Sequence, residues 1–327
     1  MNFLVIGIGS AGQRHLRVLR DFYGEHAKIF VYRGRHARGL IARDLLTENF
    51  EVDPIRHYGA IELKTLSELQ TKSWDLVIIA TPPDSHLKYT KLIAASSRRV
   101  IIEKPLSVTV SDAEEMYLLA KSHNIPIRVG YQMMFHPLRK EILKSIPLIG
   151  IIESCSTIFS EDIAFMNPFR SMNTHHLSSP KGGGVFLSLS HDLDLMLSIF
   201  DQTNVQRVSF TDNRYSDEGV LQECILHCVI NANKTILNMT NKFSILPSAT
   251  QRSGNIRGSM GHITWNLIDG SFQVSGASGK IISETFFQAK KDDLFQMQIE
   301  DILNVEHLTD TCSSNLDRAI FITKISQ

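Results

Sequence analysis

A glycine-rich turn near the start of the chain is the feature that most restricts its fold. Residues 2–8 read as an apolar strand, residues 12–23 as an amphipathic helix, and the turn between them carries the pattern GxGxxG. Such glycines allow a tight bend, a close approach of a pyrophosphate to the backbone and close packing of the helix on the strand, with the pyrophosphate at the helix N-terminus. We therefore expect a dinucleotide-binding turn rather than a plain strand-to-helix connection, formed by Gly7, Gly9, Ser10, Ala11 and Gly12.

The order of the remaining segments predicts two domains. Strands are expected at residues 2–8, 28–32, 75–80, 100–102 and 126–130, with helices at 12–23, 85–97 and 112–123. This alternation predicts right-handed βαβ units and a doubly wound parallel sheet. Further strands are expected in succession at residues 151–159, 205–211, 221–230, 235–243, 262–267 and 271–274. We predict an α/β Rossmann domain over residues 1–125. Residues 126–327 should form an α+β domain with a large, mostly antiparallel open sheet for substrate binding and oligomerisation, and its C-terminal helix has the option of packing back on the first domain.

Charge and composition exclude several classes of function. The chain has 34 basic and 34 acidic residues among 327, whereas a general nucleic-acid binder needs a basic surplus. Residues 3–8 are too short an apolar run for a signal peptide, and no stretch approaches the roughly 18 apolar residues of a membrane span. The four cysteines show neither a CxxC pair nor zinc-ligand spacing; they are Cys155, Cys224, Cys228 and Cys312. We expect a cytoplasmic protein with free thiols and without a metal site, a nucleic-acid partner or a membrane partner.

The end of the second strand predicts which dinucleotide binds. An acidic residue about 20 positions after the glycine turn would bind the ribose 2′-hydroxyl of NAD. The sequence there reads Val31-Tyr32-Arg33-Gly34-Arg35, without a carboxylate, and a guanidinium can pair with a 2′-phosphate in a forked geometry. We predict that Arg33 and Arg35 bind the cofactor and that NADP is preferred over NAD. The alternative is that both side chains stack on the adenine or face solvent.

Six later motifs add to the glycine turn. They are ATPPDSH at residues 80–86, EKP at 103–105, GYQ at 130–132, FHP at 135–137, GGG at 182–184 and SHDLD at 190–194. In this order the motifs resemble the Gfo/Idh/MocA family of NAD(P)-dependent oxidoreductases. The resemblance implies a sugar-like substrate, which includes nucleotide sugars and surface-polysaccharide precursors, and a homodimer or homotetramer joined through the second domain's sheet. It also implies cofactor contacts by these residues: Thr81, Pro82, His86, Glu103 and Gln132.

The resemblance places Lys104 beside the nicotinamide and gives His191 an acid/base role. Hydride transfer from a carbinol carbon needs a base for the hydroxyl proton, and the reverse reaction needs an acid. His191 titrates near neutrality, and on a helix that begins near Ser188 it shares a face with Asp194, which is then expected to orient the imidazole. The alternatives are a solvated surface lysine, a structural histidine and an aspartate that holds backbone.

The sequence departs from the family pattern before His191. Many members have an acidic residue three or four positions earlier, where this chain has Ser188, which cannot act as a carboxylate. The polar segment 167–184 is expected to be a long loop of the kind that serves a site. In that loop we expect Arg170 to anchor an anionic group of the substrate and His176 to face the substrate, with a surface arginine as the alternative. His136, before Pro137, is expected to be structural.

Three functions remain open from the sequence. The first is an NAD(P)-dependent dehydrogenase or reductase that moves a hydride between nicotinamide and a carbinol or carbonyl carbon of a sugar derivative, with Lys104, His191 and Asp194 at the reacting centre. The second is a ligand sensor of the same fold that binds the cofactor without turnover, which Ser188 keeps open. The third is a reductase of an imine or a linear tetrapyrrole.

Overall fold

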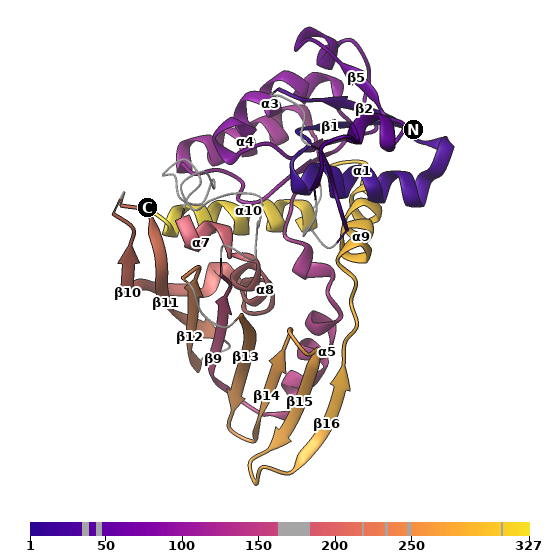
Figure 1. Ribbon diagram of the computed structural model, residues 1–327. Helices are drawn as coiled ribbons and strands as arrows, with labels where there is room; N and C mark the ends of the chain where they lie inside the picture. Colours follow the sequence, from indigo (N-terminus) through magenta and orange to yellow (C-terminus); the bar gives the residue numbers. More distant parts are fainter. Residues whose placement is uncertain are drawn as a thin grey trace. The chain divides into compact units, whose positions relative to one another are not determined.

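The computed structural model describes residues 1–34, 39–43, 48–162, 184–217, 219–232, 235–246, 250–308 and 310–327 (Figure 1). Contacts between residues divide the chain into two compact units. The first unit comprises Met1–Tyr131 together with Lys291–Gln327, and the second comprises Gln132–Lys290. Each unit is built around its own sheet.

The first unit contains a six-stranded sheet in the order β5-β2-β1-β6-β7-β8. All five pairings are parallel. The strands are β1 (Asn2–Ile6), β2 (Lys28–Tyr32), β5 (Ile61–Leu63), β6 (Leu76–Ile79), β7 (Val100–Ile102) and β8 (Ile127–Val129). The strand order reverses direction between β1 and β6, and open α/β sheets bind ligands at the carboxyl edge beside such a switch point.

Helices surround this sheet because its strands are apolar on both faces. The helices are α1 (Ser10–Tyr23), α2 (Pro54–His57), α3 (His86–Ile93), α4 (Val110–His123), α9 (Lys291–Leu303) and α10 (Asp310–Ile325). One core cluster joins the β1 side chains Phe3 and Val5 to Leu16 and Leu19 of α1 and to Ile299 of α9. Burying an aliphatic side chain of this size stabilises a fold by about 1.5–3 kcal/mol. A short hairpin of β3 (Leu40–Ile41) and β4 (Glu48–Asn49) completes the strands.

The C-terminal segment belongs to the first unit. Helix α9 packs on α1, and α10 packs on β8 and α4 (Figure 1). The Gln298 side chain donates a hydrogen bond of 3.1 Å to the carbonyl of Val129 at the end of β8. The predicted boundary at residues 125 and 126 therefore differs from the observed division, because β8 is the sixth strand of the parallel sheet. Residues 291–327 belong to the first unit and not to the second domain, where the sequence placed them. This agrees with the predicted alternative that a C-terminal helix packs back on the first domain.

The second unit contains an eight-stranded sheet in the order β10-β11-β12-β9-β13-β14-β15-β16. Only the β12–β9 pairing is parallel among the described strands of this sheet. The strands are β9 (Ile152–Ser160), β10 (Val205–Tyr215), β11 (Leu221–Ala232), β12 (Thr235–Ser244), β13 (Gln251–Gly258), β14 (Gly261–Asn266), β15 (Ser271–Gly276) and β16 (Ile281–Phe286). The described helices are α5 (Pro137–Ser145), α7 (Gly184–Ser188) and α8 (His191–Phe200).

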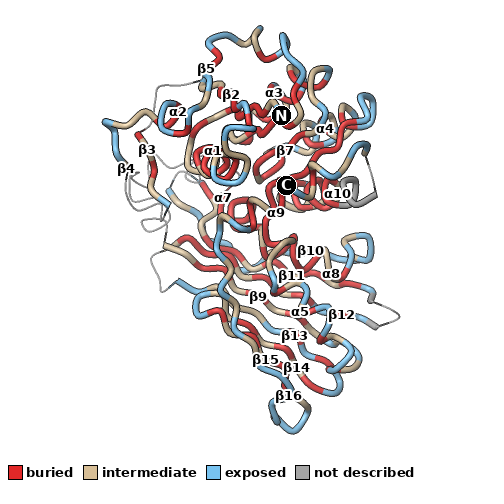
Figure 2. Tube along the Cα trace, turned by 90° about the vertical axis from the view of Figure 1, so that its right-hand side faces the viewer, coloured by how far each residue is buried: buried red, intermediate tan, exposed pale blue. Residues whose placement is uncertain are grey.

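The two faces of the large sheet differ in character. One face is buried and apolar, as Figure 2 shows along the strands, and includes Cys155, Met239, Ile256 and Ile263. On the other face, polar side chains from the same strands are half-buried or exposed: Ser154, Ser156, Thr240, Asn255, Thr264 and Gln273. This second face is polar because its alternating positions are mostly Ser, Thr, Asn and Gln.

The fold class predicted from the sequence is confirmed, with local differences. The single helix expected at residues 85–97 is α3 flanked by 3₁₀ turns, and the helix expected to begin near Ser188 begins at His191. Strands β3, β4, β5, β13 and β16 were not predicted. Among the described residues, no helix combines the length and the apolar composition that crossing a bilayer requires.

Candidate functional site

The glycine turn is packed against the neighbouring strands. Gly7 has φ of +91°, which favours glycine, and its N–H donates to the carbonyl of Tyr32 at 2.9 Å. A Cβ atom on Gly7 would lie 2.6 Å from the carbonyl oxygen of Ala80, and one on Gly12 would lie 2.0 Å from the carbonyl oxygen of Gly7. A Cβ on Gly9 would meet no atom within 4 Å. Two of the glycines therefore serve packing, and the third leaves open space above the turn.

The N-terminus of α1 is suited to an anion. Gly9 is the N-cap residue and has no side chain to accept from the first-turn N–H groups, and no acidic residue stands in that turn. Ser10 and Ala11 begin the helix. Exposed N–H groups and the positive end of the helix dipole favour a phosphate at such a position. The open space at Gly9 and this helix end fit the pyrophosphate of a dinucleotide.

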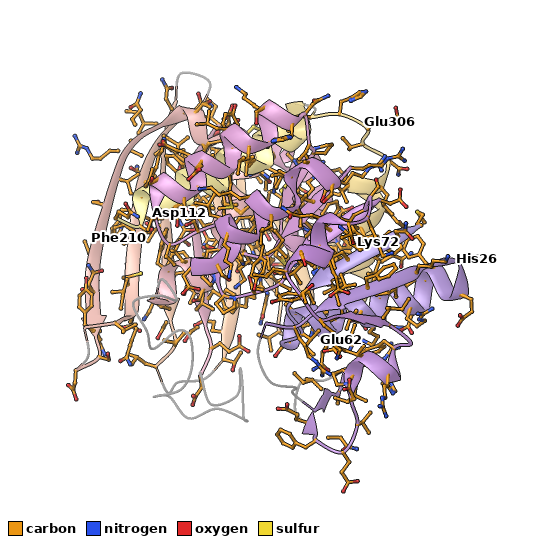
Figure 3. All side chains as sticks on the ribbon, turned by 90° about the horizontal axis from the view of Figure 1, so that it is seen from above. His26, Glu62, Lys72, Asp112, Phe210 and Glu306 are labelled. Carbon is orange, nitrogen blue, oxygen red and sulfur yellow. The ribbon has the colours of Figure 1, made fainter. Side chains whose placement is uncertain are left out.

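Arg33 lies at the end of β2, where the sequence predicted it, but two carboxylates accompany it. Its Nε donates to Oε1 of Glu62, and its Nη2 donates to Oδ2 of Asp53 at 3.1 Å (Glu62 is labelled in Figure 3). Glu62 is also paired with Lys64, and Asp53 caps α2 by accepting from the N–H of Ile55 at 2.8 Å. The sequence suggested that no carboxylate lies near Arg33, and this prediction is wrong. Asp53 and Glu62, which stand 20 and 29 positions further along the chain, contact Arg33 in the folded unit.

Arg33 keeps one nitrogen outside these contacts. Its Nη1 is buried and has no hydrogen-bond partner among the described residues. Arg33, Asp53, Glu62 and Lys64 bring two positive and two negative charges together, so the corner is close to neutral. The only group of Arg33 left for a cofactor is therefore a single guanidinium nitrogen, not the full fork.

His86 ties together the loops that follow β6 and β7. It is fully buried at the start of α3, with Nε2 2.8 Å from the carbonyl of Thr81 and Nδ1 3.0 Å from the carbonyl of Leu106. Burial lowers the pKa of His86, although the two carbonyl contacts act in the opposite direction. Thr81 itself packs beside the glycine turn, since a Cβ on Gly7 would lie 3.0 Å from its methyl group. Pro82 follows and is exposed.

Glu103 and Lys104 follow β7 at the same edge. Glu103 is buried and its carboxylate contacts His15 of α1, with 2.7 Å between Oε1 and Nε2. Lys104 is half-buried and joined to Pro105 by a cis peptide bond. The predicted residues Gly7, Thr81, Glu103 and Lys104 therefore lie at the carboxyl ends of β1, β6 and β7, which are neighbours in the sheet.

The remaining described candidates lie in the second unit, on or near α8. His191 is the first residue of α8, and Asp194 is fully buried in its first turn. Ser188 ends α7 and donates to the carbonyl of Gly184 at 2.7 Å. Gln132 is buried in the 3₁₀ turn that follows Tyr131.

A salt bridge holds α8 to the sheet. The carboxylate of Asp192 accepts from Nε and Nη2 of Arg252, whose guanidinium also lies over the ring of Phe159 at 4.3 Å. Asp192 is 4% exposed. This pair fixes the first turn of α8, which carries His191.

Three predicted residues lie outside the described part of the chain: Arg35, Arg170 and His176. Within the described part, no group of three or more His, Cys, Asp or Glu side chains is arranged to hold a metal ion. The described cysteines Cys155, Cys224 and Cys228 are free and buried, and burial raises the pKa of each thiol.

Comparison with known proteins finds a family match for the first part of the chain. Residues 1–131 match the model of the GFO_IDH_MocA oxidoreductase family, described as having an NAD-binding Rossmann fold. The match covers the first unit's sheet and its glycine turn, and the first unit is therefore similar to the NAD-binding domain of this family. These residues form a domain of the type that the family model describes as an NAD-binding Rossmann fold of oxidoreductases, in agreement with the sequence motifs.

Other similarities to known proteins extend over both units. Oxidoreductase P35 of Formosa agariphila is 24% identical over 295 residues, which are 88% of each chain. The solved structure of levoglucosan dehydrogenase, a complex with NADH and levoglucosan, gives a TM-score of 0.77 at 16% identity, covering 100% of this chain and 95% of that chain. Biliverdin reductase from Synechocystis sp. PCC 6803, a complex with biliverdin and NADP+, gives 0.75 at 15% identity, covering 98% and 96%. At these identities the two structures are similar in fold.

Three side chains at the sheet edge of the first unit were not predicted from the sequence. They are His15, Asp53 and Glu62. His15 stands three positions after Gly12 in the expected helix, on the turn nearest the glycines, and that spacing was the signal available for it. Neither acidic residue carries a local signal: Glu62 reaches Arg33 through the pairing of β5 with β2, and Asp53 reaches it from the N-cap of α2.

Proposed function

We propose that this protein transfers a hydride between a nicotinamide cofactor and a carbinol or carbonyl carbon of a sugar or sugar derivative. The observation that carries the proposal is the place of Lys104, directly after β7 and beside the loops of the glycine turn and Thr81. Ligands of doubly wound sheets bind at this edge. The fold shared with levoglucosan dehydrogenase supports a sugar-like substrate.

The bound cofactor supplies or accepts the hydride. In the direction of oxidation, the hydroxyl proton of the substrate must pass to a base, and in reduction the carbonyl oxygen must receive one. We assign Lys104 and His191 to holding and moving this proton and to orienting the substrate oxygen. Asp194 is assigned to orienting the imidazole of His191 from the first turn of α8. Ser188, which donates to a backbone carbonyl, is assigned no proton-transfer role.

The cofactor proposal has two parts. Gly7, Gly9, Ser10, Ala11 and Gly12 are assigned to the pyrophosphate, supported by the open space at Gly9 and the uncapped start of α1. Further cofactor contacts are proposed for Thr81, Pro82, His86, Glu103 and Gln132, of which the buried His86 and Glu103 would act mainly through the loops that they hold.

NADP is proposed as the preferred cofactor. The free Nη1 of Arg33 supports this preference, and Arg35 is proposed to join it at the 2′-phosphate. Titration of both cofactors tests the preference, and NAD binding at least tenfold tighter than NADP would contradict it.

Substrate contacts and assembly are also proposed. Arg170 is assigned to an anionic group of the substrate and His176 to the substrate face.

The second unit is proposed to join two copies through its sheet, because Glu153 and Arg257 line one hollow of about 590 Å³ there and a two-fold axis would place each against its opposite. Light scattering should then show a dimer or tetramer. Arg257→Glu should weaken it, and Glu153→Arg combined with Arg257→Glu should restore it.

Replacement of Lys104 tests the central proposal. Oxidised and reduced cofactor are offered with a panel of sugars, nucleotide sugars and a linear tetrapyrrole, and dihydronicotinamide absorbance is followed. Lys104→Ala should lower turnover at least a hundredfold and leave the cofactor Kd within threefold. Lys91→Ala, whose amine pairs with Glu115 on the surface, is the control. Full turnover in Lys104→Ala would remove Lys104 from the chemistry, and cofactor binding without turnover of any panel member would favour the ligand sensor.

A further inference from the structure

The loop that carries Lys104 is held at both ends by buried histidines. At its start, Nε2 of His15 lies 2.7 Å from Oε1 of Glu103, and both residues are buried. At its end, Nδ1 of His86 lies 3.0 Å from the carbonyl of Leu106. Lys104 lies between these two anchors, so its backbone is fixed by side chains from α1 and α3.

The contact between His15 and Glu103 is the tighter anchor. An ionised carboxylate only accepts hydrogen bonds, so Nε2 of His15 is the donor. Burial would raise the pKa of Glu103, but the hydrogen bond and charge of His15 and the charge of Lys104 together bring that pKa below its usual range. The second carboxylate oxygen accepts from the Lys104 N–H at 3.3 Å. A Cβ on Gly130 would lie 2.7 Å from that oxygen, which shows how closely the carboxylate is packed.

His15 connects this anchor to the helix of the glycine turn. It lies on α1 three residues after Gly12, and its ring packs on Phe295 of α9 with 4.7 Å between ring centroids. We propose that His15 is a positioning residue, which acts through Glu103 to fix Lys104 relative to the start of α1. The inference rests on the proposed function, because it concerns where the amine stands when a proton is moved.

The expected size of the effect follows from the demands of proton transfer. A proton donor or acceptor must come within about 2.6–3.2 Å of its partner, and a misplacement of about 1 Å can reduce a rate about a hundredfold. Without His15, the Oε1 atom of the buried Glu103 carboxylate would lose the donor at 2.7 Å, which is unfavourable for a desolvated charge. The loop that begins at Glu103 would then lose its side-chain link to α1.

Four variants test the inference on the full-length protein: His15→Leu, His15→Gln, Glu103→Gln and the double variant His15→Leu with Glu103→Gln. His15→Leu should lower kcat at saturating cofactor at least tenfold and leave the cofactor Kd within threefold. His15→Gln should stay within threefold of wild type, because its amide can donate to Glu103. Adding His15→Leu to Glu103→Gln should change kcat less than twofold. The inference is overturned if His15→Gln is as damaging as His15→Leu, or if only the cofactor Kd changes.

A second measurement needs no substrate. The rate at which an N-hydroxysuccinimide ester acylates Lys104 is followed by peptide mass spectrometry, with the exposed Lys91 as internal reference. Release of the loop should raise the acylation rate of Lys104 at least threefold in His15→Leu. If His15→Leu does not fold, the same increase is expected in Glu103→Gln. An unchanged rate overturns the inference. Protection of Lys104 by NADP in the wild type tests the proposed function separately, since it does not depend on His15.

Discussion

The guanidinium of Arg17 on α1 donates two hydrogen bonds of 2.9 Å to the carboxylate of Asp292 on α9. Arg14 and Arg43 also lie within 4 Å of this carboxylate. Burial would raise the pKa of Asp292, but the hydrogen bond and charge of Arg17 and the charges of Arg14 and Arg43 bring it below its usual range. One carboxylate therefore fastens the C-terminal segment to the helix that begins at the glycine turn.

Replacing Asp292 should destabilise the first unit strongly. In Asp292→Asn, Arg17, which is 4% exposed, keeps a buried charge without its anion, and breaking a buried pair in this way costs about 3 kcal/mol. Urea unfolding measures the loss. Lys91→Ala breaks an ion pair whose side chains are about half exposed and should cost less than about 1 kcal/mol. Equal losses in the two variants would show that the Asp292 contact adds nothing beyond a surface pair.

Two glycines of the turn should respond differently to alanine. Gly9→Ala places a methyl group where no protein atom lies within 4 Å, so its cost should be limited to about 0.5–1 kcal/mol from the poorer N-cap residue. The Kd for NADPH, measured by fluorescence, should still rise at least tenfold if the pyrophosphate lies over Gly9. Gly12→Ala places Cβ 2.0 Å from the Gly7 carbonyl oxygen and should destabilise by about 1–3 kcal/mol. Normal NADPH binding by Gly9→Ala would move the pyrophosphate elsewhere.

His136 should make stability fall in mild acid. Burial lowers its pKa to about 4, the charge of Arg252 adds to this and Asp192 opposes it. Its Nδ1 accepts from the N–H of Leu138 at 3.1 Å and so caps α5. Above about pH 6.5 the ring is neutral in both folded and unfolded chains, so its contribution is fully present. As the pH falls from 6.5 toward 4, only the unfolded chain binds the proton, and stability is lost.

The variant His136→Asn isolates this effect, because asparagine can still cap the helix and does not titrate. The free energy of unfolding is measured at pH 7.5 and pH 5. Since the ring is partly exposed, the wild type should lose about 1 kcal/mol more than the variant between these values. The same loss in both proteins would mean that His136 is not a source of the acid sensitivity.

The sequence could predict what is local and apolar. The glycine turn, the buried strands and the Lys104 motif each depend on neighbouring residues, and the structure places them at one sheet edge. Strand β13 was missed because Gln251–Gly258 has a single buried apolar side chain, Ile256, and two glycines. It forms a strand because it pairs with β9 and β14 on either side. The residues of β13 themselves do not show this pairing.

The candidate site shows the same limit for charges. Arg33 was predicted from its position after β2, whereas its partners depend on chain pairing far along the sequence. Glu62 reaches Arg33 because β5 pairs with β2 through Phe30 and Ile61. The residues near β2 therefore predict the guanidinium of Arg33 but not the carboxylates of Asp53 and Glu62 that neutralise it.

Cofactor choice should depend on Arg33 despite these anions. Its Nη1 has no hydrogen-bond partner among the described residues, and we expect this nitrogen to turn toward the 2′-phosphate of NADP, a group that NAD lacks. Arg33→Ala should raise the Kd of NADPH at least tenfold and change the Kd of NADH less than threefold, as measured by fluorescence titration. Arg43→Ala removes a side chain that is 68% exposed and should leave the ratio of the two Kd values unchanged. A parallel loss of both cofactors in Arg33→Ala would assign Arg33 to holding Asp53 and Glu62 in place, because a structural role would not discriminate by the phosphate.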